Sequence, residues 1–350
     1  MKPLLLPLFS KSTNDIRVRL RAVTFFTLLQ FLVSCGDHLS PIRSAEIASK
    51  GLYSAKITRR SDFIVAGSIN HGGSLWRLTD HERLFNWNHK NGEFSSILTA
   101  DFSAQGKLAL TADTNTLVLW DVQSGQARRF WSAPAEILDI ALAANGKHAL
   151  LGLSDSTAVI FDVINGGVKR KFQHSKAVIS VDFSADGRLA LSGSSDQTAI
   201  LWNVASGEKL KTFRHRDEVP LVKLSDDGKL AFTVGKYDSA ILWNTVNGEK
   251  LGELPLQAQY MKRGVRFTAA VFSAGNQYLL TGRPDQIVTL WHSENLQPKQ
   301  RWKLPKRKAW KPVNAAVLSL AFGQKTNTFI AVSADGFIHY LSDGTSQTGF

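Results

Sequence analysis

Histidine, hydroxyl and carboxylate side chains recur along the sequence in sets that could support nucleophilic catalysis. His174, Ser192 and Asp196 are the residue types of a catalytic triad, in which a histidine activates a hydroxyl and a carboxylate orients the histidine. A second set follows about 41 residues later: His215, Thr233 and Asp238. A set that repeats at a fixed interval is typical of a structural unit rather than of one active site. The recurrence therefore favours architecture over catalysis.

Other sequence motifs that carry chemistry are missing. The chain contains no GxSxG elbow, P-loop, GxGxxG or HExxH motif, and its nine histidines have no spacing that would gather metal ligands on one element. Paired carboxylates occur only in turn-like stretches such as Asp226-Asp227. We therefore predict a protein that is not an enzyme and that uses no metal and no cofactor.

Cys35 is the only cysteine in 350 residues, so no disulfide can form within the chain. It comes just after the uncharged run AVTFFTLLQFLV, residues 22–33, and five basic residues precede that run against one acid. A run of this length is too short to span about 30 Å of hydrocarbon as a helix, which needs about 20 residues. A basic start, a short apolar core and a small residue before a cut site are the parts of a secretory signal peptide.

The residues around the cysteine, Leu32-Val33-Ser34-Cys35, resemble the lipobox of bacterial lipoprotein signal peptides. The resemblance implies that residues 1–34 are removed and that Cys35 carries the lipid, with residues 35–40 as a tether. Two or three acyl chains anchor a protein stably. Gly36 after the cysteine implies, in a Gram-negative source, an outer-membrane lipoprotein facing the periplasm. The alternatives are a buried cysteine that acts as a small apolar residue, or an uncleaved membrane anchor.

The composition is that of a globular protein with a strongly basic surface. Hydrophobic residues make up 43% of the chain and charged residues 20%, and the formal charge is +13. Removal of residues 1–34 leaves a charge of +9, so the basic character belongs to the folded part. A surface of this kind favours anionic partners such as acidic proteins, lipid headgroups, polysaccharide phosphates or nucleic acid.

Aromatic residues that close apolar runs such as LVLW, AVIF and AILW divide the chain into similar segments. They are Trp76, Trp120, Phe161, Trp202, Trp243, Trp291 and Tyr340, with separations of 44, 41, 41, 41, 48 and 49 residues. In the clearest unit we expect strands at residues 177–184, 188–194, 198–204 and 208–214, joined by turns rich in Asp, Ser and Gly. A period near 40 with four short strands per unit predicts a β-propeller blade.

These units resemble the WD40-repeat family over about residues 41–343, which implies an all-β fold with seven blades, one for each aromatic residue. In that family a strand-three Trp, a strand-two Ser or Thr, a turn Asp and a His form a hydrogen-bonded structural group. The matching residues are His174, Ser192, Asp196 and Trp202 in blade four, His215, Thr233, Asp238 and Trp243 in blade five, and Thr281, Asp285 and Trp291 in blade six. Buried indole N–H groups need acceptors and buried carboxylates need donors, so each set can satisfy itself.

The last unit lacks a fourth strand, because only LSDGTSQTGF follows Tyr340. A gap-free alignment of residues 51–68 on residues 177–194 leaves residues 41–49 at the position of a fourth strand. We therefore predict that residues 41–49 complete blade seven and close the ring, which removes exposed strand edges. The propeller then spans residues 41–343, and residues 344–350 form a C-terminal tail.

Two long connections, residues 255–266 and 296–314, carry basic and aromatic residues between a fourth strand and the next first strand. By the family's geometry, such connections lie on the same face as the turns between strands two and three, as does the smaller insertion at residues 86–94. The predicted partner-binding residues are Lys262, Arg263, Arg266, Lys299, Arg301, Trp302, Lys303, Lys306, Arg307, Lys308, Trp310 and Lys311. Aromatic residues beside Arg and Lys suit protein contacts. In the alternative interpretation Trp302 belongs to the core and the lysines form a solvated loop.

The leading hypothesis is a non-catalytic interaction scaffold, tethered to a bacterial membrane and bound to envelope proteins. A second hypothesis is a binder of envelope polyanions, such as lipopolysaccharide or wall polymers, through the same basic face. A third is a propeller enzyme with a quinone cofactor, but the glycine-rich tryptophan motif that such propellers carry in each blade is not found. The export signal argues against nucleic acid as a partner.

Overall fold

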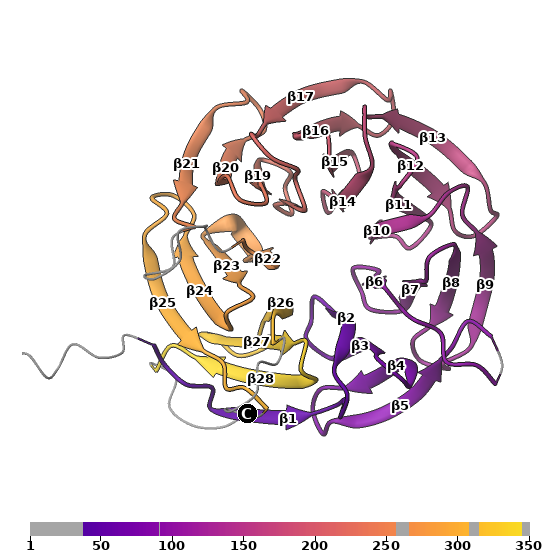
Figure 1. Ribbon diagram of the computed structural model, residues 1–350, viewed down its shortest axis with the longest axis vertical. Helices are drawn as coiled ribbons and strands as arrows, with labels where there is room; N and C mark the ends of the chain where they lie inside the picture. The colour runs from indigo at the N-terminus through magenta and orange to yellow at the C-terminus, as the bar shows by residue number, and fades with distance from the viewer. Residues whose placement is uncertain (1–37, 91, 257–265, 308–314, 345–350) are drawn as a thin grey trace, which may run out of the picture. The chain divides into compact units, whose positions relative to one another are not determined.

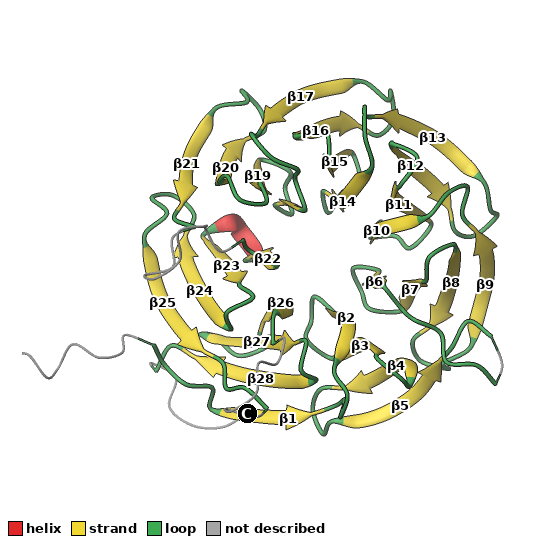
Figure 2. Cartoon of the chain, in the orientation of Figure 1, coloured by secondary structure: helices red, strands yellow, loops and turns green. Residues whose placement is uncertain are grey.

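The structure, a computed structural model, describes residues 38–90, 92–256, 266–307 and 315–344 (Figure 1). Residues Ser40–Phe350 make up one compact unit. Its described part contains seven four-stranded antiparallel sheets that stand as blades around a central channel. The regular structure of the described residues is almost entirely strand, with one 3-10 helix, η1 (Ala274–Asn276) (Figure 2). The predicted all-β, seven-bladed propeller is therefore confirmed.

Six of the blades take their four strands consecutively from the chain, from the channel to the rim. Blades one and two contain β2 (Leu52–Ile57), β3 (Phe63–Ser68), β4 (Gly72–Arg77), β5 (Glu82–Trp87), β6 (Thr99–Phe102), β7 (Leu108–Ala112), β8 (Thr116–Asp121) and β9 (Ala127–Ser132). Blades three and four contain β10 (Ile137–Leu142), β11 (His148–Leu153), β12 (Thr157–Asp162), β13 (Val168–Gln173), β14 (Val178–Phe183), β15 (Leu189–Ser194), β16 (Thr198–Asn203) and β17 (Lys209–Arg214). Blades five and six contain β18 (Leu221–Leu224), β19 (Leu230–Val234), β20 (Ala240–Asn244), β21 (Lys250–Leu254), β22 (Ala269–Phe272), β23 (Tyr278–Gly282), β24 (Ile287–His292) and β25 (Pro298–Lys303).

Blade seven is built from both ends of the propeller unit. Its strands β26 (Val317–Phe322), β27 (Thr328–Ser333) and β28 (Phe337–Ser342) are completed by β1 (Arg43–Glu46), which pairs antiparallel with β28. Arg43 lies opposite Tyr340, and the Ile42 N–H donates to the Tyr340 carbonyl at 2.8 Å. The prediction that residues 41–49 complete this blade is therefore confirmed. The pairing covers an edge of β28 that would otherwise be free to pair with another chain.

The hydrophobic core lies between neighbouring blades. A buried residue near the end of a rim strand packs on the aromatic residue of strand three in the next blade, because both side chains face the interface between the two sheets. Three of these pairs are stacked rings: Trp87 with Trp120, Phe172 with Trp202, and Phe213 with Trp243, with ring centroids 5.0, 5.0 and 4.8 Å apart. An aromatic pair of this kind contributes roughly 0.5–1.5 kcal/mol beyond its buried area.

Two predicted features of the chain fall outside this description. The signal peptide at residues 1–34 and the lipidated Cys35 lie outside the described residues, and so do residues 345–350 of the predicted tail. Within the described residues, the structure has no helix with the length and apolar character needed to cross a membrane.

Candidate interaction face

The serine, histidine and aspartate of blade four form a continuous hydrogen-bond chain that begins at the indole of Trp202. The Trp202 indole N–H donates to Ser192 Oγ at 2.8 Å, and Ser192 Oγ lies 2.8 Å from His174 Nε2. His174 Nδ1 lies 2.9 Å from the carboxylate of Asp196. Ser192 is fully buried, so its hydroxyl cannot meet a substrate. The set is structural, and its resemblance to a catalytic triad is only in residue type.

Burial fixes the protonation state of this set. Desolvation lowers the pKa of His174, although the bond with Asp196 raises it in part. Burial opposes ionisation of Asp196, but bonds from Thr198, the Ser175 N–H and His174 bring its pKa down to about 2. His174 is therefore neutral near pH 7, with its Nδ1 proton donated to Asp196 and its Nε2 accepting from Ser192.

Blade two contains a further set of this kind, which the matching of repeat units in the sequence did not identify. His89 Nε2 lies 2.8 Å from Thr111 Oγ1, which accepts the Trp120 indole N–H at 2.8 Å, and His89 Nδ1 lies 3.2 Å from Asp113. The insertion at residues 86–94 hides the match, because it places the histidine 22 residues before the threonine rather than 18 as in blade four. The contact with Asp113 also places this connection beside the turn between strands two and three.

Blade six has no histidine in its hydrogen-bonded group, as its sequence indicates. The Trp291 indole N–H donates to Thr281 at 2.8 Å, but Asp285 forms an ion pair with Arg283 at 2.7 Å in place of a histidine contact. Arg283 belongs to the same short turn, so this side chain takes the role of the missing histidine in holding the carboxylate.

One face of the ring collects the connections between blades together with the turns between strands two and three. The His174 N–H donates to the Ser156 carbonyl at 3.0 Å, and the Leu304 N–H donates to the Gln286 carbonyl at 2.9 Å. Each bond joins the end of a rim strand to such a turn of the same blade. The connection that follows β25 therefore opens on this face, as the family's geometry implies.

Three of the predicted partner-binding residues are exposed on or beside this face: Arg266, Lys303 and Lys306. Desolvation lowers the pKa of Lys303, and the positive charges of Lys306 and Arg283 lower it further against the attraction of Asp285. Positive charge is therefore concentrated at this corner of blade six. Five other predicted residues lie outside the described residues: Lys262, Arg263, Lys308, Trp310 and Lys311.

Trp302 is a correction to the predicted set. It is fully buried, its ring lies 5.0 Å from that of Phe329, and its indole N–H donates to the Ser342 carbonyl at 2.8 Å. It occupies the position near the end of a rim strand where blades one, three and four also bury an aromatic ring between blades. The expectation that Trp302 contacts a partner is wrong, and the alternative that it belongs to the core is correct.

Lys299 and Arg301 are placed on β25 rather than in a loop of the face. Lys299 lies toward the opposite end of that strand, with its Nζ 3.9 Å from the Asp343 carboxylate and 4.7 Å from the centre of the Tyr278 ring. The prediction that both gather with the loop lysines is therefore wrong, because β25 begins at Pro298, inside the segment assigned to the connection.

Arg307 has a structural role in closing the ring. Its guanidinium pairs with Glu46 at 2.7 Å and donates to the carbonyls of Ala48 and Asp335 at 2.6 and 2.7 Å. It also lies 4.8 Å above the centre of the Phe337 ring. These contacts join the connection after β25 to the closing segment and to the turn before β28. Most hydrogen-bond donors of the guanidinium are therefore already used within the protein.

The central channel, a cavity of about 670 Å³, is lined by the first strand of every blade. Two ion pairs lie in it: Lys56 lies 3.0 Å from Asp101, and Lys223 lies 3.5 Å from Asp182. Burial raises the pKa of Asp139, although Lys223 lowers it in part. Within the described part of the chain, no group of three or more His, Cys, Asp or Glu residues could hold a metal ion.

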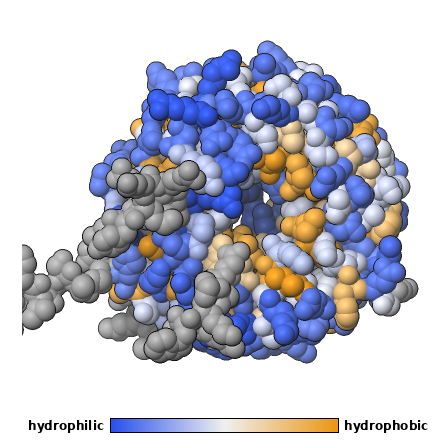
Figure 3. Space-filling view, viewed as in Figure 1, coloured by the Kyte–Doolittle hydropathy of each residue, from blue (hydrophilic) through white to orange (hydrophobic). Residues whose placement is uncertain are grey.

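The mouth of the channel on the connection face is apolar. Tyr53, the second residue of β2, and Leu98, the residue just before β6, line the channel and are 49% and 41% exposed. Figure 3 shows the hollow at the centre of the ring with hydrophobic residues beside it. Exposed apolar residues rimmed by charge are typical of a protein-binding surface.

The fold and these contacts define a seven-bladed β-propeller with repeated structural hydrogen-bond groups and a basic, partly apolar face. Residues 166–203 match the family model described as WD domain, G-beta repeat. The match covers one repeat, and together with the seven-bladed ring it supports a relationship to the WD40-repeat family. Among curated proteins, no match to this chain is found.

Proposed function

We propose that the protein is a non-catalytic interaction scaffold, held at the bacterial cell envelope by lipid on Cys35. The WD-repeat match supports the general role, because propellers of this family are commonly scaffolds for protein interactions. The lipobox-like residues before Cys35 support the tether. The site is the connection face of blades five to seven together with the mouth of the channel.

The observation that carries this proposal is the pairing of free positive charge with exposed apolar surface. Arg266 and Lys306 are exposed and have no ion-pair partner within 4 Å among the described residues, while Tyr53 and Leu98 offer apolar area at the channel mouth. An acidic protein surface with an apolar centre fits this arrangement, because charge guides the encounter and apolar burial holds the complex.

The test is crosslinking in intact cells with the double variant Arg266→Glu/Lys306→Glu. We expect loss of the main crosslinked protein, and a matched control, Lys107→Glu/Lys147→Glu, should retain it because those exposed lysines lie in turns between strands one and two. A second control, Cys35→Ala, should release the protein from the membrane. Unchanged crosslinking in the Arg266→Glu/Lys306→Glu variant would show that this face does not bind the partner. Membrane retention of the Cys35→Ala variant would show that lipid on Cys35 is not the anchor.

A second candidate function is direct binding of an envelope polyanion, which the two neighbouring exposed cations Lys303 and Lys306 favour. Salt separates the two functions. Polyanion binding should weaken steeply as ionic strength rises from about 0.05 to 0.3 M, whereas an interface with apolar contacts should lose much less affinity.

A further inference from the structure

A side chain from the rim strand crosses most junctions between blades and covers the turn between strands three and four of the next blade. Successive examples are the Phe85 ring over Gly125, Arg129 Nε on the Ile164 carbonyl at 2.9 Å, Arg170 on the Ser206 carbonyl at 3.0 Å, and Lys211 Nζ on the Asn247 carbonyl at 3.3 Å. All four occupy the same position, two residues before the aromatic residue that packs on the next blade: Trp87, Trp131, Phe172 or Phe213. The covered turns carry a glycine in the left-handed region: Gly125, Gly166, Gly207 and Gly248, with φ between +72° and +84°.

The junction between blades five and six reverses this arrangement. The position of the crossing side chain is occupied by Gly252, and the position of the turn glycine is occupied by Leu296, at φ +54°. A leucine in the left-handed region is strained, because its Cβ crowds the following carbonyl oxygen. A Cβ on Gly252 would lie 2.5 Å from the Leu296 side chain, so that side chain folds back over the strand. Strain of this kind points to a local function.

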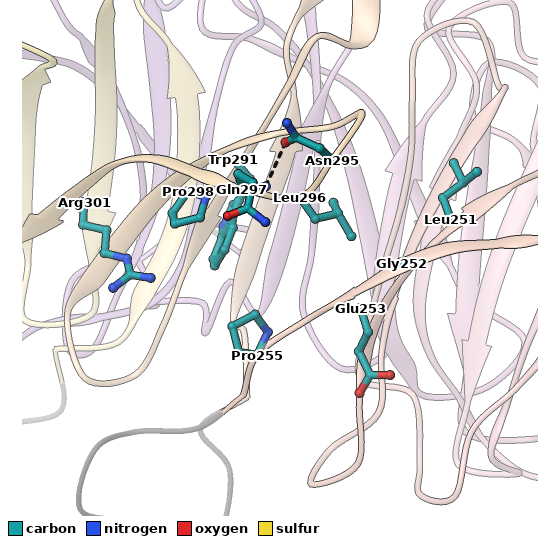
Figure 4. Close-up of a pocket in the computed structure, with 10 residues that line it drawn as sticks. All are labelled: Leu251, Gly252, Glu253, Pro255, Trp291, Asn295, Leu296, Gln297, Pro298 and Arg301. Carbon is teal, nitrogen blue, oxygen red and sulfur yellow. Dashed lines mark hydrogen bonds between the residues drawn. The ribbon is translucent and has the colours of Figure 1, made fainter.

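The reversal leaves a groove of about 350 Å³ at the rim of the molecule. In Figure 4, Pro255 lies below Trp291 and Leu296, with Leu251 and Arg301 on opposite sides. At this junction Leu254 takes the place of the aromatic ring that elsewhere stacks between blades, which reduces the filling of the space. Leu251 is 46% exposed, so apolar surface is open at the groove.

The charges at the groove favour an anion. Arg301 is half-buried at one wall and has no ion-pair partner within 4 Å among the residues that the structure describes. The only carboxylate among the lining residues, Glu253, is paired with Lys250 at 2.6 Å. The guanidinium of Arg301 is thus the unpaired charge, and its planar donors suit a carboxylate.

We propose that this groove docks an acidic segment of a partner protein. One large apolar side chain of the segment lies between Leu251, Trp291 and Leu296, and a flanking Asp or Glu pairs with Arg301. The volume suits one large side chain, because it is at the lower end of the range for ligand sites. The free edge of β21 faces outward, so an extended segment can also meet unpaired backbone groups. The groove adjoins the connection that begins at Pro255, but its charged residue, Arg301, lies on β25 and is distinct from Arg266 and Lys306 of the connection face.

The test is a selection from a displayed library of random ten-residue peptides on the full chain in detergent. Binders to the wild type should be enriched in an aliphatic or aromatic residue beside Asp or Glu. Fluorescence anisotropy with a selected peptide should then show binding at least about tenfold weaker for Arg301→Glu, and no binding for Gly252→Leu, which fills the groove. The matched control Arg188→Glu, an exposed arginine in another blade, should bind like the wild type.

Melting temperature and circular dichroism verify that each variant is folded. The Arg266→Glu/Lys306→Glu variant should retain the peptide, which separates this groove from the connection face. Selection of uncharged or basic peptides, or equal binding by Arg301→Glu and the wild type, would overturn the proposal. A concentration-dependent dimer that Gly252→Leu abolishes would also overturn it, because the groove would then hold a second copy of this chain.

Discussion

Blades four and seven contain the same antiparallel sheet but are held together in different ways. In blade four, all strands come from residues 178–214, and His174, Ser192, Asp196 and Trp202 bond with one another over short sequence distances. In blade seven, the rim strand comes from the other end of the unit, and its contacts span about 295 residues, as in the 2.8 Å bond between Ser44 and His339.

The difference lies in when and how each blade can form. A blade made from one continuous segment gains its contacts at a small cost in loop entropy, whereas blade seven requires the ring to be nearly complete before β1 can pair. Local groups therefore define the individual blades, and the long-range contacts of blade seven define the ring. Changes in blade seven should act on closure, and changes in blade four should act on a single sheet.

Deletion of residues 41–49 should have the largest effect. It removes β1 and buried Ile47 and exposes the edge of β28, so we expect a loss of about 4 kcal/mol or more and a tendency to associate. Thermal unfolding and size-exclusion chromatography measure both effects. A synthetic peptide of residues 40–50 should restore the melting temperature in part. An unchanged melting temperature in the deletion would show that closure contributes little.

Ser192→Ala should destabilise blade four by about 2–3 kcal/mol. The change leaves the Trp202 indole N–H and His174 Nε2 buried without their partner. Urea unfolding measures the loss, and Ser132→Ala, an exposed serine on a rim strand, should change the free energy of unfolding by less than about 0.5 kcal/mol. Equal effects of the two changes would contradict the structural role assigned to this set.

Mild acid should weaken blade seven. Burial lowers the pKa of His339 to about 4, well below its ordinary value of 6.5, and both ring nitrogens bond to serine hydroxyls, Ser44 on β1 and Ser333 on β27. The unfolded chain takes up the proton first, so this stability is complete above pH 6.5 and is lost as the pH falls toward 4. Linkage gives a loss of about 2 kcal/mol at pH 5.

Unfolding of the wild type and of His339→Gln between pH 7 and pH 5 tests this effect. The variant should lose much of the pH dependence, and His71→Gln, at an exposed position, should retain it. His174 in blade four should contribute less, because its bond to Asp196 favours the protonated form. A pH dependence that is the same in His339→Gln and the wild type would contradict the prediction.

Arg307→Gln should have the smallest of these effects, about 1–2 kcal/mol. It removes the ion pair with Glu46 and weakens the bonds to the carbonyls of Ala48 and Asp335, but the side chain is 21% exposed and water replaces part of the loss. Lys306→Gln, one residue away and exposed, should leave the melting temperature unchanged. Similar shifts for both variants would show that Arg307 does not hold the closing segment.

The sequence is sufficient to predict the ring because its repeated features are local. The spacing of the closing aromatic residues defines the blades, and the four strands of blade four lie within one residue of the expected bounds at each end. The closing strand is also predictable, because an ungapped alignment leaves a segment with no other place. His89 is less accessible to this reasoning, since an insertion shifts it from the position that the repeat defines.

The candidate face is only partly predictable, because side-chain contacts decide it. Trp302 can be assigned to the core once it is aligned with Trp87, Phe172 and Phe213, whereas its basic neighbours suggest a loop. The ion pair of Arg307 with Glu46 joins residues 261 positions apart, and no local pattern indicates it. At the junction of blades five and six, Gly252 stands at the strand position and Leu296 at the turn position. This exchange becomes visible only when the junction is compared in space with the junctions of the other blades.

The closing of blade seven by β1 has one more consequence. The chain enters this sheet at Ile42 and leaves it after Ser342, and Ile42 bonds directly to Tyr340, so the two points are near neighbours. A short linker could join them, and new ends could be opened in the exposed turn at Ala205-Ser206 without breaking a sheet. Such a circular permutant would retain all seven blades and transfer the covalent break from blade seven to blade four.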